Sequence, residues 1–249
     1  MRLSSWLGRL ASGLFVLSLP VLFGTLSLRW LVSDVGWYKA GFAKYGVSEP
    51  TNMAPAELDR SAGEISRYLL IQRDNVDIPV KVGGVTIPLF NEREIHHMED
   101  VQKLLSDFYN LQAGVAAYVL LYLAVGWIRH RGGGWPLLGT KLRWGGALTL
   151  GLFAGFGVLS MFNFDELFLQ FHVMSFDNDL WILDPSKDRL VMMFPQGFWY
   201  DSAIRLALGT GAQALGALLI GLFIERAFSR QTSAAIGHPA GVASREADR

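Results

Sequence analysis

The stretch WGGALTLGLFAGFGVLSMFNF, residues 144–164, decides the fold because it runs for 21 residues without an Asp, Glu, Lys, Arg or His. A helix needs about 20 mostly apolar residues to cross a hydrocarbon core of about 30 Å. Three more uncharged stretches of similar length occupy residues 10–28, 111–128 and 206–224. Stretches this long are rare in the buried helices of soluble proteins, so the sequence predicts four membrane-spanning helices.

The charges divide the connections between these stretches into two kinds. The connection at residues 129–143 holds four basic residues and no acidic one, whereas residues 34–110 carry 8 basic and 12 acidic residues. Residues 165–203 carry 2 basic and 7 acidic residues. Because Lys and Arg collect in cytoplasmic loops, we expect both termini and the 129–143 loop inside the cell, and both long loops outside.

The long loops have patterns of their own. Residues 55–71 have the periodicity of a helix, and residues 78–89 read as a β-hairpin with Gly83-Gly84 at its turn. Asn91 and Glu94 have the spacing of a capping box, which would begin a helix that continues into the second span. In the third span, the spacing of Gly151 and Gly155 predicts a site of close helix packing.

The fold class is therefore a mainly α membrane protein, with four transmembrane helices and a small extracytoplasmic α/β cap built from the two outer loops. The expected segments are a first transmembrane helix (1–33), the cap (34–110), a second helix (111–128), a cytoplasmic loop (129–143), a third helix (144–164), an aromatic outer loop holding His172 (165–203), a fourth helix (204–228) and a disordered cytoplasmic tail (229–249).

Several classes of chemistry are excluded. The chain has no cysteine, so it forms no disulfide and uses neither a thioester nor a cysteine-bound metal. It has no Gly-x-Ser-x-Gly elbow, no His-Glu-x-x-His helix and no phosphate-binding glycine loop. None of the four uncharged stretches carries an ionisable residue of the kind that marks an ion pathway, which disfavours a channel or pump.

Two histidine segments lie in the expected outer loops. In the first, Glu94 and Asp100 flank His97 at positions i−3 and i+3, so a carboxylate could reach its ring and make it a better base. Alternatively, His96 and Asp100 at i and i+4 could bind a metal ion, or the segment could be a solvated helix face. In the second, His172 lies among phenylalanines near the lipid surface, where burial would keep it neutral and able to act as a base.

Together these segments resemble a known family. The motifs are residues 94–101 (EIHHMEDV) and Phe171-His172, followed by Trp181, by Asp188-Arg189-Leu190 and by Phe194-Pro195. They are similar to those of the bacterial lipoprotein intramolecular transacylase (Lit) family, and the resemblance extends to the four spans and the long first outer loop.

The resemblance implies an activity and a site. The family moves the sn-2 acyl chain of a diacylglyceryl-cysteine onto the α-amino group of the same cysteine. By match of motif, His97 and His172 correspond to the essential histidines, and we expect these residues to support or orient them: Glu94, Asp100, Asn178, Trp181 and Asp188. The expected partners are the diacylglyceryl-modified lipoprotein N-terminus and membrane lipid, with no nucleic acid, no cofactor and no metal. The expected location is the bacterial cell membrane, with the active site extracytoplasmic.

Two other functions fit the residues. One is a non-enzymatic membrane protein whose outer cap binds a partner or a divalent metal through His96 and Asp100. The other is a related lipid acyltransferase or lipase with a different substrate.

Overall fold

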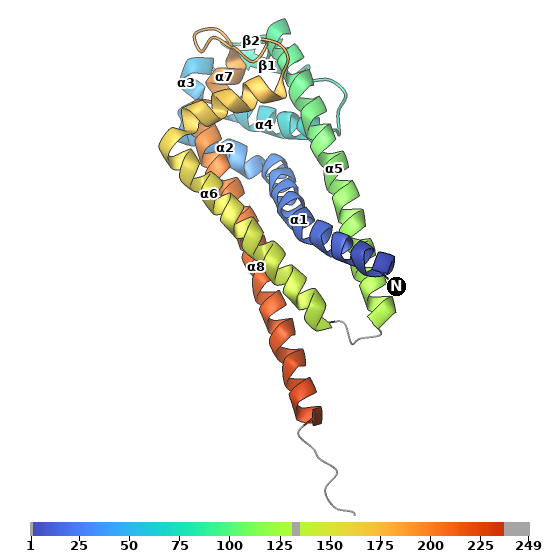
Figure 1. Cartoon of the computed structure of the whole chain (residues 1–249). Coiled ribbons are helices and arrows are strands. Elements are labelled where there is room, and N and C mark those ends of the chain that lie inside the picture. Colours follow the sequence, from blue (N-terminus) through green and yellow to red (C-terminus); the bar gives the residue numbers. More distant parts are fainter. Residues whose placement is uncertain (1, 131–134, 237–249) are drawn as a thin grey trace, which may run out of the picture.

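The computed structural model describes residues 2–130 and 135–236 (Figure 1). Four helices in these ranges are long and apolar enough to cross a membrane: α1 (Arg2–Ser33), α5 (Glu92–His130), α6 (Trp135–Ser175) and α8 (Gln196–Ile236). The expectation of four spans is confirmed, and the chain is a multi-pass membrane protein. We use the uncharged stretches, residues 10–28, 111–128, 144–164 and 206–224, as the membrane-spanning segments.

Short elements form a cap at one end of the long helices (Figure 1). They are α2 (Val35–Lys44), α3 (Ser48–Thr51), α4 (Pro55–Leu69), β1 (Pro79–Val82), β2 (Val85–Pro88) and α7 (Arg189–Met193). The larger buried apolar cluster lies mostly in this cap and includes Met53, Ile65, Tyr68, Leu89 and Met193. The cap is therefore a folded unit with its own core.

The cap confirms the local patterns of the first outer loop. Strands β1 and β2 pair antiparallel, with Val82 opposite Val85. Gly83 and Gly84 at the turn have φ values of 57° and 85°, which only glycine adopts without strain. Helix α5 then runs without interruption from Glu92 into the membrane, which ties the cap rigidly to a spanning helix.

Helix α6 corrects the expected aromatic loop at residues 165–203. At Asn163 the backbone leaves the helical conformation (φ −150°, ψ 51°), and the helix then resumes through Ser175. The part after this bend lies across the end of the bundle, below the cap (Figure 1). Phe164 packs against Tyr200, and Phe168 packs against Trp199, at centroid distances of 5.5 and 6.0 Å. These contacts with the start of α8 stabilise a helix where a loop was expected.

The expected tail is also corrected. Helix α8 continues to Ile236, so residues 229–236 are helical and not disordered. No glycine or proline interrupts the sequence between residues 222 and 236, and both return at Gly237 and Pro239. Residues 237–249 of the expected tail lie outside the described residues.

Close helix packing occurs elsewhere than expected. A Cβ atom at Gly151 or Gly155 would meet open space, so the predicted packing site is wrong. A Cβ at Gly146 would lie 2.6 Å from the Ala214 carbonyl oxygen, and one at Gly221 would lie 2.6 Å from the Gly139 oxygen. These three glycines face the contact between α6 and α8, which brings the two backbones together at the end of the bundle remote from the cap.

Candidate active site

The first turn of α5 is held by reciprocal capping. The Asn91 side-chain oxygen accepts from the Glu94 N–H at 3.0 Å, and the Glu94 carboxylate accepts from the Asn91 N–H at 2.7 Å. This confirms the capping box. The other Glu94 oxygen accepts from the Leu190 N–H at 2.5 Å, and Asp188 accepts from the Asn91 amide at 2.8 Å. The network fixes the start of α5 against α7, one helical turn before His97.

This network corrects the expectation that a carboxylate orients His97. Glu94 is occupied by two backbone N–H groups, and Asp100 accepts from the Asn178 amide at 2.8 Å. Among the described residues, no hydrogen-bond partner reaches Nδ1 of His97, although this nitrogen is buried. The His97 side chain lines the adjoining cavity.

The neighbouring His96 faces away from the site. Its side chain is 52% exposed, and its Nδ1 lies 3.0 Å from Glu99. His96 therefore pairs with Glu99, whereas the alternative of a metal site requires His96 and Asp100 to bind the same ion. In the described ranges, no group of three His, Asp or Glu side chains is arranged to hold a metal ion.

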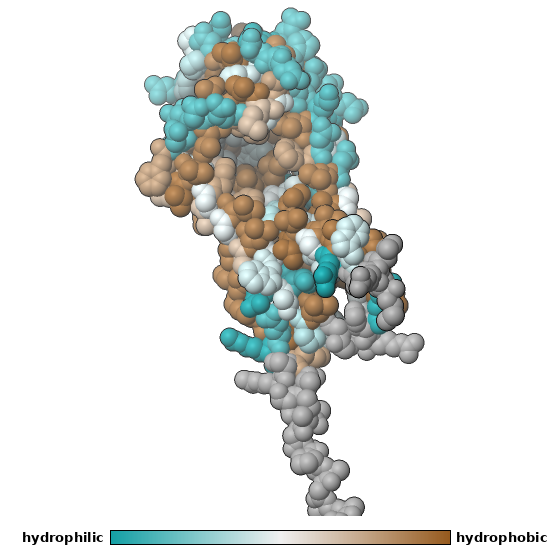
Figure 2. All heavy atoms as spheres, in the orientation of Figure 1, coloured by the Kyte–Doolittle hydropathy of each residue, from teal (hydrophilic) through white to brown (hydrophobic). Residues whose placement is uncertain are grey.

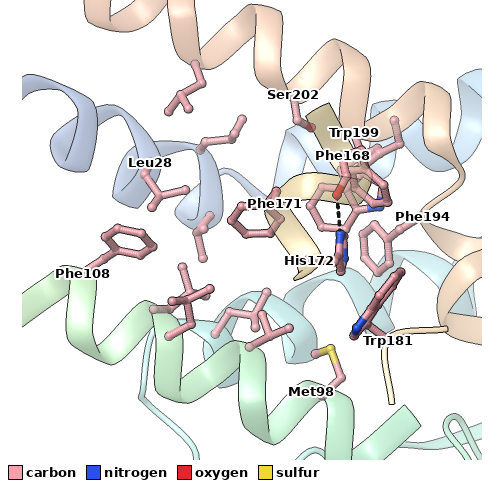
Figure 3. Close-up of a pocket in the computed structure, with 18 of the residues that line it drawn as sticks. Leu28, Met98, Phe108, Phe168, Phe171, His172, Trp181, Phe194, Trp199 and Ser202 are labelled. Atoms are coloured by element: carbon pink, nitrogen blue, oxygen red, sulfur yellow. Dashed lines mark hydrogen bonds between the residues drawn. The ribbon is translucent and has the colours of Figure 1, made fainter. Parts of the chain in front are cut away.

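His172 lies in the last turn of α6, enclosed by aromatic rings. Its Nδ1 donates to the backbone oxygen of Phe168, four residues earlier, at 2.7 Å (Figure 3). This bond fixes the tautomer, because Nδ1 carries the proton and Nε2 keeps its lone pair. The ring contacts Phe168, Phe171, Phe176 and Trp181 at centroid distances of 4.4 to 5.8 Å.

The two histidines meet although 75 residues separate them in the chain (172 − 97). Their ring centroids are 6.2 Å apart, and the Phe176 ring contacts both. Both lie outside the membrane-spanning segments. Burial lowers the pKa of His97 to about 4, with a further contribution from His172, and burial also lowers the pKa of His172. Both imidazoles are therefore neutral at pH 7.

An apolar cavity of about 950 Å³ adjoins both rings. Its walls come from α1, α5, α6, α8 and the cap, and include Leu28, Phe108, Phe171, Trp181 and Phe194 (Figure 3). Figure 2 shows a hollow among hydrophobic residues directly below the hydrophilic cap. The cavity continues along α1 to Pro20 and Val21, which are about 16–18 Å from Val32 at 1.5 Å per residue. It suits a long apolar chain.

The expected supporting residues divide into two groups. The Trp181 ring packs against His172 at a tilt of 36°, with centroids 5.1 Å apart, and so contacts the site directly. Glu94, Asp100, Asn178 and Asp188 form hydrogen bonds within and between α5, α7 and the 176–188 segment, and none of these bonds involves either imidazole. They hold the elements that carry the site.

Two contributors were not expected from the sequence. The Phe168 backbone oxygen sets the His172 tautomer, which the i−4 spacing would have indicated had residues 165–175 been assigned as a helix. Arg205 pairs with Asp34 at 2.6 Å and lies between Trp30 and Trp37, at 4.5 and 4.4 Å from their ring centroids. This contact joins α1, α2 and α8 beside the cavity.

Replacing Glu94 with alanine should destabilise the cap. The change leaves the Asn91 and Leu190 N–H groups without acceptors, and an unsatisfied buried group costs about 1–3 kcal/mol. We expect the apparent Tm in detergent to fall by about 5–10 °C and by less for Glu94→Gln, which keeps one acceptor. Glu99→Ala, which removes an exposed carboxylate on the same helix, is the control. An equal loss of Tm in both alanine variants would contradict this role.

The fold and site define a class: a membrane-integral protein whose paired histidines border an apolar cavity. A family model described as lipoprotein intramolecular transacylase Lit matches residues 13–199, which is most of the chain. The chain therefore belongs to the Lit family, whose description is that of a transferase.

Solved structures of similar fold agree. The membrane-integral lipoprotein intramolecular transacylase Lit from Bacillus cereus matches with a TM-score of 0.73 at 17% identity, over 92% of this chain and 99% of that chain. A variant of that protein with one histidine changed to alanine matches with a TM-score of 0.72 at 16% identity, over 92% and 98%. At this identity the likeness shows a shared fold.

A curated relative matches over a shorter region. An uncharacterized protein of Aquifex aeolicus (strain VF5) is 34% identical over 121 residues, which are 48% of this chain and 50% of the relative. The match thus spans about half the length of that relative.

Proposed function

We propose that this chain transfers an acyl chain within a lipoprotein, from the sn-2 ester of a diacylglyceryl-cysteine to the α-amino group of the same cysteine. Membership of the Lit family supports the reaction class. The observation that carries the proposal is the pair of buried imidazoles, 6.2 Å apart, beside an apolar cavity of about 950 Å³.

His172 is the general base in this proposal. A protonated amine cannot attack an ester, and the free amine must lose a proton as the new bond forms. The hydrogen bond from Nδ1 to Phe168 leaves the Nε2 lone pair of His172 free to accept that proton. The aromatic surroundings favour the neutral imidazole at physiological pH.

His97 is the proton donor or oxyanion partner. The amine nitrogen bonds to the ester carbonyl carbon, and the resulting oxyanion is stabilised by an N–H group. The bond from carbon to the glyceryl oxygen then breaks, and this oxygen takes a proton. The N–H group of neutral His97, which lines the cavity, can donate a hydrogen bond to the oxyanion. As proton donor, His97 passes on to the glyceryl oxygen the proton that His172 took from the amine, so both imidazoles end neutral and the products are an amide and a free glyceryl hydroxyl.

No enzyme nucleophile is needed, since the amine and the ester belong to one molecule. The protein's main task is to hold the amine against the ester carbonyl in the right orientation, so the reaction needs no encounter between separate molecules. The apolar cavity holds the acyl chains, and the protein supplies neither cysteine nor a serine elbow to form an acyl intermediate.

The proposed partners are therefore a diacylglyceryl-modified lipoprotein N-terminus and membrane lipid. The basic residues between positions 129 and 143, of which 135–143 are helical in α6 where a loop was expected, and the acidic cap support an orientation with both termini in the cytoplasm and the histidines on the extracytoplasmic side of the cell membrane.

Mass spectrometry of the N-terminal peptide of a diacylglyceryl-lipoprotein tests the proposal. Incubation with the purified protein should leave the mass unchanged and move one acyl chain from glycerol to the amine, as fragmentation would show. Release of a free fatty acid instead would indicate a lipase. A peptide unchanged by the folded protein would overturn the proposal.

Filling the far end of the cavity should change the preferred acyl chain. Val21→Trp places a large ring about 16 Å along α1 from the cap, where the end of a long chain would lie. Excluding two methylene groups costs about 1.6 kcal/mol at 0.8 kcal/mol each, so palmitoyl transfer should fall about tenfold relative to lauroyl transfer. The measurement is competition between the two lipopeptides. Leu14→Trp, on the same helix outside the cavity, should leave the ratio unchanged, and an unchanged ratio in Val21→Trp would contradict this placement.

A further inference from the structure

A second apolar groove lies at the opposite end of the long helices from the histidines. Its volume is about 1250 Å³, and its walls come from the start of α1, the end of α5 and the start of α6. Helix α5 packs along α1 here, whereas α6 packs along α8 and α1. Helices α5 and α6 diverge from this end of the bundle toward the cap (Figure 1), and residues of both helices line the groove.

Three basic side chains line this groove: Arg9, Arg129 and Lys141. No acidic side chain is among its described lining residues. Within residues 2–130 and 135–236, no carboxylate pairs with any of the three. By contrast, the nearby Arg143 pairs with Glu225 at 3.4 Å. The groove thus carries a positive charge that the described part of the chain does not neutralise.

Tryptophans and small apolar residues make up much of the remaining surface. Trp127 and Trp135 pack edge to face at 5.2 Å, and Trp144 lies one helical turn beyond Lys141. Trp127 and Trp144 are 61% and 58% exposed. Exposed tryptophans concentrate at the level of lipid headgroups. The side chains of Arg9, Arg129 and Lys141 therefore lie at the level of a lipid phosphate group, and the apolar walls of the groove lie at the level of the acyl chains.

We propose that this groove binds an anionic phospholipid, with its phosphate held by Arg9, Arg129 and Lys141. Basic pockets between transmembrane helices recognise anionic headgroups in this way. The apolar walls favour a lipid over a free phosphate ion. The bound lipid fills the gap between α5 and α6 and stabilises the bundle at the end farthest from the cap. The site is separate from the histidine site and does not depend on the proposed reaction.

The test compares lipids added to the full chain purified in a mild detergent. Phosphatidylglycerol should raise the apparent Tm by about 5 °C, through binding to the folded state alone. Phosphatidylcholine and inorganic phosphate should raise it by less than half as much. Native mass spectrometry should show a phosphatidylglycerol adduct that survives transfer from the detergent.

The deciding variant is Arg9→Gln/Arg129→Gln/Lys141→Gln, which should lose the adduct and most of the shift. The matched control, Lys81→Gln/Lys103→Gln/Lys187→Gln, removes three exposed cations from the cap end and should keep both. If the triple variant fails to fold, Arg9→Lys/Arg129→Lys takes its place. This variant preserves the positive charge and should bind phosphatidylglycerol as the parent protein does. An equal shift with phosphatidylcholine or with inorganic phosphate, or an undiminished adduct in the triple variant, would overturn the proposal.

Discussion

Replacing His172 with alanine should lower the rate of acyl transfer by about 10²–10⁴-fold, the usual contribution of a positioned general base. His172 is 8% exposed, and the hydrogen bond to Phe168 fixes its tautomer. Its ring centroid lies 6.2 Å from that of His97, and the rings of Phe168, Phe171, Phe176 and Trp181 pack around it. The measurement is the initial rate of amide formation on a diacylglyceryl lipopeptide.

His96→Ala is the matched control for this experiment. It removes a histidine from the same outer region, but one that is exposed and paired with Glu99, so the rate should stay within about twofold of the parent, because exposed substitutions rarely perturb a distant site. The apparent Tm of each variant shows whether a loss of rate comes from the missing base or from unfolding of the protein. A stable His172→Ala protein with the parent's rate would remove His172 from the mechanism.

Replacing His97 with alanine should cost about 10²–10³-fold, as the loss of one oxyanion donor does. The expected loss follows from geometry: His97 lines the cavity, and its ring centroid lies 6.2 Å from that of His172. His97→Gln returns an N–H group near the position of Nε2 but cannot give up a proton. Recovery of part of the rate in His97→Gln would assign the oxyanion role, whereas no recovery would assign the proton donor.

The double variant tests whether the two histidines act together. Groups that serve one transition state give losses that do not add, so His97→Ala/His172→Ala should be little slower than His172→Ala alone. If the two losses multiply, the imidazoles act on separate steps, and their 6.2 Å separation has no mechanistic meaning.

The two histidines lie on segments that are held by different kinds of contact. His97 lies on α5, which the Asn91–Glu94 cap and the core of the cap domain hold firmly. His172 lies beyond the bend at Asn163, on a helical segment stabilised by aromatic contacts.

Local patterns in the sequence determined much of the architecture. Uncharged stretches define spans because a buried charge is costly in lipid. The Gly83-Gly84 hairpin and the Asn91–Glu94 capping box are equally local, because each needs only residues a few positions apart. The family resemblance, carried by the motifs around His97 and His172, is confirmed by the match over residues 13–199.

Only the tertiary structure decided how the site is assembled. No spacing in the chain places His97 beside His172, because that contact depends on how α6 bends and crosses below the cap. The sequence suggested Glu94 as a partner for His97, but burial against Leu190 gives that carboxylate two backbone donors instead. Helix periodicity reports which residues can be neighbours along one element, whereas the competition among distant donors and acceptors is settled only when the elements pack.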